Sequence, residues 1–406
     1  MSKRKFLTPE FGPLSGIRIL GSGSAVAMPS AGNMLADLGA EFIHIERPGK
    51  GDVTTRSLSD IWHQEARNRL SLTLELDLHK PEIKETFMEL IKHSDVFMEN
   101  QVWLDKFGIY DEELLAANPK LVIVHVSGFG SEAFGGAEGF TGRASYDIIG
   151  QAFSGYLSLN GSEELPYVEK PYTNDFVTAL WVAFSVMSAL RHVEKTGEGQ
   201  IVDVSQYEAM ARITAGEYVK AQRTNKNPAR SLTNDSLQPF GLYRTKGNDF
   251  VAIASASPGV YHRVLDSVGF DKEAYPFNEV AMGAKNLQSE KGQEFDTKFR
   301  QWCLEHTADE VDDIMAQYRV PCSKVNTMQD VLEHPHFESR NNWAEYENKQ
   351  TGFTAKSFGA FPHFSKTPGK VWRGAPDVGD DTEAILKEII NLPEDKIQIL
   401  KEKGYI

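Results

Sequence analysis

Residues 171–191 read PYTNDFVTALWVAFSVMSALR, and the rest of the chain is organised around this stretch. From Asp175 to His192 almost every residue is apolar or small, and no Pro or Gly interrupts the run. Apolar residues on every side, rather than in one stripe, predict a helix that is buried all round. Asn174 is a favourable N-cap for this helix, and Gly197 is a favourable stop.

Asp175 is the carboxylate in the first turn of this expected helix. Unpaired backbone N–H groups and the helix dipole favour an anion at that position. An aspartate that opens a helix is most often a cap, but Asn174 already offers that function. Asp175 is therefore free for another task, and a carboxylate kept ionised among aromatic and apolar groups is a candidate nucleophile.

Upstream of this stretch the chain opens with a strand–helix–strand pattern. Its parts are a strand at 17–20, the glycine turn GSGSAV at 21–26, a helix at 29–38 and a strand at 41–45. The glycine turn, with Glu46 after the second strand, is typical of nicotinamide-cofactor domains. Val26 stands where the third glycine of that fingerprint belongs, so a plain strand-to-helix turn explains the pattern at least as well.

The alternation of strands and helices continues beyond residue 200. Expected strands lie at 70–78, 95–98, 121–126 and 200–205, and expected helices at 81–93, 111–118 and 207–222. Apolar strands that alternate with helices indicate an α/β fold with a doubly wound, mostly parallel, Rossmann-like sheet. Ligands of such sheets bind beyond the carboxyl ends of the strands. The residues that follow expected strands, and so lie where a ligand would bind, are Glu46, Arg47, Asn100 and two glycine-rich segments at 21–26 and 127–130.

A second, smaller α+β domain is expected after residue 223. Residues 224–239 are polar and lack periodicity, so they are interpreted as a linker, and a hairpin at 241–257 opens the domain. Helices are expected at 261–268, 294–305, 308–317, 382–390 and 394–403. The expected division is a large domain over 1–223, a small domain over 224–330, and a C-terminal segment over 331–406 that returns to the large domain.

Charge and composition restrict the possible functions. A net charge of −14 and a pI near 5.3 argue against nucleic acid and against anionic membrane surfaces as partners. No apolar run follows the basic N-terminus, so we expect no signal peptide and a cytoplasmic protein. Cys303 and Cys322 lack metal-type spacing, and His334 and His336 lack a third ligand, so no metal site is expected.

A series of short motifs runs through the chain in a fixed order. They are FGPLSG at 11–16, NMLADLGAE at 33–41, IERPGKGD at 45–52, PKLVIV at 119–124, SGFG at 127–130, SYD at 145–147, QAFSGY at 151–156, TGEGQ at 196–200 and GAPDVG at 374–379. In this order and spacing, the chain resembles the class III CoA-transferases, the family of formyl-CoA transferase and carnitine CoA-transferase, over nearly its whole length. QAFSGY and KPYT at 170–173 look most like the carnitine (betaine) branch.

This resemblance implies roles for particular residues. The catalytic aspartate of the family falls on Asp175. The residues implied to contact CoA are Arg47, Lys106, Asn100, Tyr146 and Asp147, with Val26 and Ala27 along the pantetheine channel. A guanidinium suits a phosphate because it offers several charge-assisted hydrogen bonds in one plane. Without the resemblance, Arg47 would be a surface ion-pair partner, Lys106 a solvated lysine and Tyr146 a core residue.

The chain departs from the family pattern in two places. NQVW at 100–103 lacks the arginine that the family carries there, so this anion contact is either missing or supplied elsewhere, with Arg67 and Arg69 as candidates. DSLQP at 235–239 replaces the glycine-rich lid of the formate and oxalate branch, which argues against those two substrates.

The activity implied is transfer of CoA from an acyl-CoA to a free carboxylic acid through adducts on Asp175, with CoA as substrate and no tightly bound cofactor. The branch implies carnitine, γ-butyrobetaine or crotonobetaine as acids, with Tyr172 and Trp181 as aromatic partners for the quaternary ammonium. Oxyanion donors are expected near residues 23–27 or before Gly241. The family also implies an interlocked homodimer. A nicotinamide-dependent dehydrogenase and a noncatalytic CoA-binding protein remain as rival interpretations.

Overall fold

The computed structural model describes the chain except for residues 1–3, 102–103, 229, 231–235 and 348–351. The chain falls into two compact units: unit 1 comprises residues 1–156, 169–219 and 338–406, and unit 2 comprises residues 157–168 and 220–337. Residues 157–168, expected in the large domain, thus belong to unit 2. Parts of the NQVW and DSLQP segments and of the expected linker lie outside the described residues.

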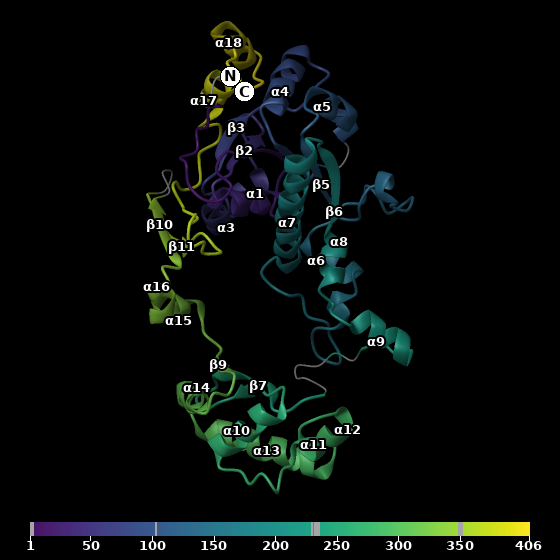
Figure 1. Ribbon diagram of the computed structural model, residues 1–406, viewed down its shortest axis with the longest axis vertical. Helices are drawn as coiled ribbons and strands as arrows, with labels where there is room; N and C mark the ends of the chain where they lie inside the picture. Colours follow the sequence, from purple (N-terminus) through teal and green to yellow (C-terminus); the bar gives the residue numbers. More distant parts are fainter. Residues whose placement is uncertain (1–3, 102–103, 229, 231–235, 348–351) are drawn as a thin grey trace. The chain divides into compact units, whose positions relative to one another are not determined.

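Unit 1 is built on a six-stranded parallel sheet (Figure 1) with the strand order β3-β2-β1-β4-β5-β6. The strands are β1 (Arg18–Ser22), β2 (Glu41–Glu46), β3 (Leu70–Thr73), β4 (Val96–Glu99), β5 (Val122–Ser127) and β6 (Gln200–Ser205). All five neighbouring pairs in this sheet are parallel. This order reverses direction between β1 and β4, as in doubly wound sheets, so the predicted fold class is confirmed.

Helices cover both faces of this sheet because successive strand side chains point to opposite sides. On one face, α1 (Ala27–Asp37) and α7 (Thr173–Thr196) pack against Ile19, Val96 and Val124. On the other face lie α4 (Pro81–Lys92), α5 (Asp111–Ala117), α17 (Thr382–Ala384), a π-helical turn (Ile385–Ile389) and α18 (Glu394–Glu402). The end of the chain therefore supplies part of the core of unit 1.

Helix α7 differs from its sequence prediction at its start and in its burial. Tyr172, with a left-handed φ of 47°, occupies the N-cap position, and Asn174 lies inside the first turn, so Asn174 as N-cap is wrong. Burial all round is also wrong, because Leu180 is 59% and Phe184 62% exposed. These two side chains line an apolar groove of about 790 Å³ together with Phe358, Phe361 and Phe364.

Helix α7 is also long and apolar enough to cross a membrane, as judged by length and composition alone. A core helix of a soluble protein passes the same test. Here Ala179, Val182 and Val186 of α7 are fully buried in the core that α7 shares with the sheet.

The remaining α-helices and β-strands of unit 1 are short. They are α2 (Val53–Arg56), α3 (Ser59–Glu65), α6 (Asp147–Phe153), α8 (Gln206–Arg212), the antiparallel pair β10 (Trp343–Glu347) and β11 (Thr354–Phe358), and the start of α9 (Glu217–Thr224). The single helix expected at 207–222 is wrong. The structure has α8 and α9 instead, because the chain between them turns at Ala215, whose φ is 52°.

Unit 2 contains a three-stranded antiparallel sheet, β7 (Phe240–Arg244), β8 (Phe250–Ala254) and β9 (Cys322–Lys324). The β7–β8 hairpin confirms the one expected at 241–257. The helices are α10 (Pro258–Val268), α11 (Phe277–Val280), α12 (Ala284–Leu287), α13 (Glu290–Glu305), α14 (Ala308–Gln317), α15 (Met328–Glu333) and α16 (Pro335–Ser339). An aromatic core that includes Tyr261, Phe295 and Phe299 joins the helices to the sheet.

Candidate active site

The Asp175 carboxylate is buried at the start of α7, with 5% of the residue exposed. The carboxylate does not cap its own helix. Asp147, at the start of α6, caps it instead: Asp147 Oδ1 accepts hydrogen bonds from the backbone N–H of Asn174 at 2.7 Å and of Asp175 at 3.3 Å. The side chain of Asp175 is thereby left available for chemistry.

Asp147 is itself held from two sides. Gln151 Nε2 donates to Asp147 Oδ2 at 2.7 Å, and Asn174 Nδ2 donates to the Asp147 carbonyl oxygen at 3.0 Å. A Cβ on Gly150 would lie 2.1 Å from Asn174 Nδ2, so α6 can approach α7 this closely only with glycine there. The two carboxylates are consequently fixed near each other.

The surroundings of Asp175 favour its protonated form. Burial, followed by the negative charge of Asp147, raises the pKa of Asp175 to about 7, and a hydrogen bond from Gln206 opposes part of this rise. Gln206 Nε2 donates to Asp175 Oδ1 at 2.6 Å. A buried carboxylate that titrates near neutral pH is at once available as an anion and poorly solvated, which are properties of a reactive nucleophile.

A second feature at the same edge of the sheet is a cavity of about 640 Å³ beyond the ends of β2 and β3. Its lining includes four side chains that carry or can carry positive charge, Arg47, Lys50, His79 and Lys106, together with the carboxylates of Glu46, Glu75 and Asp77. Leu74, Leu76 and Phe107 supply an apolar side. A cavity with basic side chains and an apolar side suits a ligand that has both anionic groups and a flat apolar part, such as a nucleotide.

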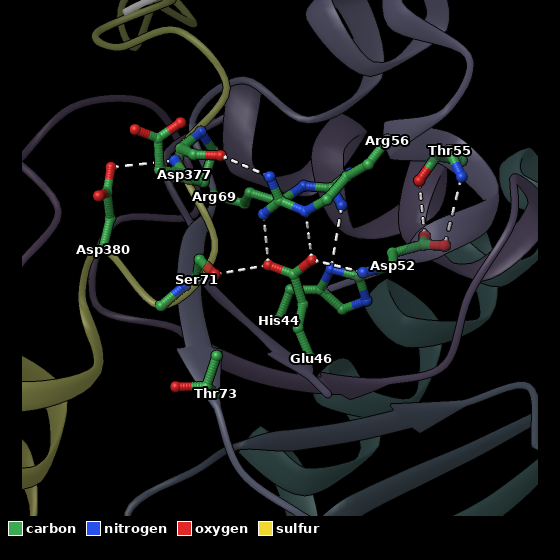
Figure 2. Close-up of polar contacts among 12 residues, drawn as sticks. His44, Glu46, Asp52, Thr55, Arg56, Arg69, Ser71, Thr73, Asp377 and Asp380 are labelled. Carbon is green, nitrogen blue, oxygen red and sulfur yellow. Dashed lines mark hydrogen bonds and ion pairs between the residues drawn. The ribbon is translucent and has the colours of Figure 1, made fainter. Parts of the chain in front are cut away.

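The turn that carries Arg47 and Lys50 is held by Glu46, whose carboxylate lies between Arg56 and Ser71 (Figure 2). Arg56 donates from Nε to Glu46 Oε1 at 2.8 Å and from Nη2 to Oε2 at 2.7 Å. Ser71 Oγ and the Asp52 backbone N–H also donate to Glu46, at 2.5 and 2.8 Å. Burial would raise the pKa of Glu46, but the bonds to Arg56 outweigh it and lower this pKa to about 2.

The GAPDVG motif at 374–379 reinforces this network from the C-terminal segment. Arg56 Nη1 donates to the Pro376 carbonyl oxygen at 3.1 Å, and the Gly379 N–H donates to Ser71 Oγ at 2.8 Å. With four donors, the buried Glu46 carboxylate has no capacity left for a ribose hydroxyl. A nicotinamide cofactor would need Glu46 to bind its ribose hydroxyl, so this observation argues against the nicotinamide interpretation.

Asn100 does not line the Arg47 cavity. Its Oδ1 accepts from the Ser24 N–H at 3.0 Å and its Nδ2 donates to the Ser24 carbonyl at 2.7 Å, which locks the glycine turn at 21–26. A Cβ on Gly23 would lie 1.8 Å from Asn100 Oδ1, so this contact requires glycine. Val26, the last residue of this turn, and Ala27, which follows it, are both buried.

Arg67 and Arg69, the candidates for the missing arginine, are not among the residues that line this cavity. Arg67 is buried against Asp37, with Nη2–Oδ2 at 2.5 Å. Arg69 is buried beside His44, with Nη1–Nδ1 at 3.1 Å. The basic side chains that line the cavity include Lys50 and His79 instead.

The aromatic residues proposed from the sequence are divided between surface and core. Tyr146 is 66% exposed, so the core interpretation is wrong, and Tyr172 is exposed three residues before Asp175. Trp181 packs against the core of the sheet and meets the ring of Phe184 edge-on at 5.7 Å. Of the two proposed ammonium partners, Tyr172 is therefore the exposed one and the closer to Asp175 in sequence.

Sequence reasoning missed Gln206, Gln151, Lys50 and His79. A signal existed for Gln206, because it directly follows β6 and so lies at the ligand-binding edge of a parallel sheet. Gln151 opens the QAFSGY motif, but the motif gave no indication that its side chain would be buried within α6 and hold Asp147. Among the described residues, no group of three or more His, Cys, Asp or Glu is arranged to hold a metal ion.

Comparison with known proteins gives a consistent result. Residues 14–382 match the protein family described as CoA-transferase family III. A bile acid CoA-transferase, BaiK, of Clostridium scindens is 33% identical over 401 residues, which cover 98% of this chain and 90% of that protein.

Solved structures with the same fold include a CAIB/BAIF family protein from Brucella suis, with a TM-score of 0.78 at 23% identity, covering 94% of this chain and 100% of that one. Rv3272 from M. tuberculosis gives a TM-score of 0.77 at 22% identity, covering 92% and 98%. At these identities the two structures establish the fold alone.

Proposed function

Because the chain belongs to CoA-transferase family III and is a CoA-transferase, we propose that it transfers CoA through covalent adducts on Asp175. The observation that carries this proposal is the state of that side chain. The carboxylate is buried, its pKa is raised to about 7, and Asp147 rather than Asp175 caps helix α7.

The first half of the reaction consists of two nucleophilic steps. An Asp175 oxygen attacks the carbonyl carbon of the donor acyl-CoA, and the C–S bond breaks to give an acyl–aspartyl anhydride and CoA thiolate. The thiolate then attacks Cγ of Asp175, and the C–O bond of the anhydride breaks. The products are an aspartyl–CoA thioester and the free donor acid, so one difficult exchange becomes two activated steps.

The second half runs in reverse with the acceptor. Its carboxylate attacks the aspartyl–CoA thioester and expels thiolate, which then attacks the acyl carbonyl of the new anhydride. Acyl-CoA product leaves and the Asp175 carboxylate is regenerated. All atoms and charges balance with acyl-CoA and the acid alone, so the reaction as proposed needs no tightly bound cofactor. Retention of the thiolate beside the anhydride favours recapture over hydrolysis.

For CoA, we propose that its phosphates bind in the cavity that carries Arg47, Lys50, His79 and Lys106. Arginine and lysine form charge-assisted hydrogen bonds with phosphate oxygens. Further proposals are Val26 and Ala27 along the pantetheine channel, Tyr146 and Asp147 near the thiol end, and Asn100 as a CoA contact. Val26 and Ala27 are buried, and Asn100 is bonded to Ser24. These observations favour a role for the three residues in supporting the site over direct contact with CoA.

The acid substrate has two candidates. Acids of the carnitine, γ-butyrobetaine and crotonobetaine type are implied by the motifs of the carnitine branch, and Tyr172 is an exposed ring near Asp175 that can attract a quaternary ammonium. The second candidate is a bulky apolar acid of the bile acid type. It is supported by the similarity to the bile acid CoA-transferase and by a partly exposed aromatic cluster of Phe140, Phe153 and Tyr207 next to Gln206.

A panel of acyl-CoA donors and free acids, with new thioesters identified by mass spectrometry, separates these candidates. Faster exchange with betaines than with uncharged acids of similar size supports the first. Exchange with a bile acid but not with betaines supports the second. Equal rates with short uncharged acids would contradict both.

We also propose that the enzyme is an interlocked homodimer that acts in the cytoplasm. The apolar groove lined by Leu180, Phe184 and Phe361 supports a partner surface on unit 1. Sedimentation that reveals folded monomers at low concentration would contradict the dimer.

The proposed chemistry is tested by incubation of the enzyme with an acyl-CoA donor and no acceptor. After digestion, the peptide that contains Asp175 should carry CoA or the acyl group. Hydroxylamine should remove the adduct and leave a hydroxamate on the same residue. Exchange activity with an adduct on a different residue would reject Asp175 as the nucleophile.

A further inference from the structure

We infer that the side-chain amide of Gln206 is a catalytic residue of the CoA transfer: it presents one oxygen of Asp175 for attack and then stabilises the oxyanion that forms on the other. This inference rests on the proposed role of Asp175 as nucleophile. It concerns a residue at the carboxyl end of β6, outside the glycine turn and the loop before Gly241, where oxyanion donors are expected from the sequence.

The position of Gln206 is set by the sheet. Strand β6 pairs in parallel with β5 up to Ser127 opposite Ser205, and Gln206 is the next residue. The Tyr207 N–H donates to the Gly128 carbonyl oxygen at 3.4 Å, which ties the start of α8 to the segment after β5. Gln206 is 7% exposed. Its side chain therefore approaches Asp175 from a rigid element and with little access to water.

The bond between these two side chains selects the attacking oxygen. Gln206 Nε2 donates to Asp175 Oδ1 at 2.6 Å, and this is the one side-chain hydrogen bond to that carboxylate among the described residues. Oδ1 is thereby occupied, whereas Oδ2 keeps its lone pairs for the thioester carbonyl. A carboxamide does not ionise near neutral pH, so Gln206 donates this bond without transferring a proton to the nucleophile.

The same bond acquires a second use in the next step. Once Oδ2 has formed the anhydride, Oδ1 is the aspartyl carbonyl oxygen. When thiolate attacks Cγ, the electron pair of the C=O bond moves onto Oδ1, and the C–Oδ2 bond then breaks to release the donor acid. A donor at 2.6 Å already occupies the position that an oxyanion-hole group requires.

The fold of the site does not depend on this bond. Asp147, not Gln206, holds the start of α7 through the N–H groups of Asn174 and Asp175. Loss of the Gln206 amide should therefore change the chemistry at Asp175 while the helix keeps its place.

The test compares Gln206→Met, which keeps the length of the side chain but removes the donor, with Gln200→Met at the opposite end of β6. Loss of one oxyanion donor lowers kcat by roughly 10²–10³-fold. We expect such a loss for Gln206→Met with KM values nearly unchanged, and wild-type activity for Gln200→Met. The pH midpoint of kcat should also move upward, because the bond from Gln206 lowers the pKa of Asp175. A purely structural role would not produce this shift.

The product ratio provides an independent readout. With slower thiolate attack on Cγ, more of the anhydride is lost to water, so Gln206→Met should release more free acid from the donor for each transfer completed. If Gln206→Met does not fold, as judged by circular dichroism and melting temperature, Gln206→Glu takes its place. That variant removes the amide and sets a carboxylate against Asp175, so the same loss of kcat and a larger upward pH shift are expected.

Failure of this inference is distinct from failure of the proposed function. If Asp175→Asn is inactive but Gln206→Met keeps kcat within threefold of wild type, the nucleophile stands and the role of Gln206 is rejected. A loss of kcat with no change in pH midpoint or product ratio also rejects it. Full activity of Asp175→Asn would reject both.

Discussion

Replacing Asp175 by Asn should abolish CoA transfer and at the same time make the protein more stable at alkaline pH. The substitution keeps the shape of the side chain but removes the anionic nucleophile, so no anhydride can form. Stability should rise because the substitution removes a charged carboxylate that, in the wild-type protein, is poorly solvated and lies near Asp147. If Asp175 only capped α7, the substitution should change neither transfer activity nor stability, since Asn caps a helix as well as Asp.

The size of the stability change follows from the pKa. The pKa of Asp175 is raised from 3.8 to about 7 on folding, and each unit corresponds to about 1.4 kcal/mol. Below pH 4 the carboxyl is protonated in both states, so the substitution should change stability little. Between pH 4 and pH 7 only the unfolded chain loses the proton, and the native protein is destabilised progressively. Above pH 7 the difference reaches about 4 kcal/mol in favour of Asp175→Asn.

The assay measures the free energy of unfolding in urea at pH 5 and pH 8, together with transfer activity at pH 8. Asp313→Asn, at an exposed position of α14, serves as a matched control that should change neither property. Asp175→Asn should be more stable than wild type at pH 8, with a smaller gain at pH 5. Full activity with deamidation excluded by mass, or lower stability at pH 8, would refute the reasoning.

Three further predictions follow from the charged groups of the site. Arg47→Ala should raise KM for an acyl-CoA donor about 10–150-fold, equivalent to about 1.5–3 kcal/mol, but leave KM for an acyl-pantetheine unchanged; equal penalties would show a structural role. Glu46→Gln should cost roughly 3–5 kcal/mol in urea unfolding at pH 7, because Arg56 loses its buried partner. The wild-type contribution of Glu46 should persist above pH 4.5 and disappear as the pH falls toward about 2. Asp147→Asn should lower the pH midpoint of kcat, since a negative charge beside Asp175 is removed; an unchanged midpoint would contradict this.

The parallel sheet was predictable because its signals are local. Most strands of the parallel sheet are short, largely apolar runs, and the long covering helices show their own period and stop, so the order of these elements appears directly in the sequence. The break between α8 and α9 was not predictable in the same way. Ala215 adopts a φ of 52°, and alanine carries no signal for that conformation.

The error at the N-cap of α7 and the burial of the two arginines both arise from partners that lie far away in the chain. Asn174 is a sound N-cap by type, but Asp147, 27 positions earlier, supplies the acceptor. Arg67 and Arg69 have the right chemistry for a phosphate, yet Asp37 and His44 hold them in the interior. Residue type therefore indicated which chemistry a side chain can perform. The place of the side chain in the structure depended on neighbours that only the folded chain brings together.

The position of Asp175 explains why this residue was nevertheless found from the sequence. A carboxylate in a long apolar segment has few local partners, and removing it from water has a large free-energy cost. The negative charge of Asp147 nearby adds to this cost, and the hydrogen bond from Gln206 offsets only part of it. A stable fold would not require such an arrangement, since Asn would satisfy the same space. The cost is consistent with a group that must be anionic and weakly solvated in order to attack a thioester.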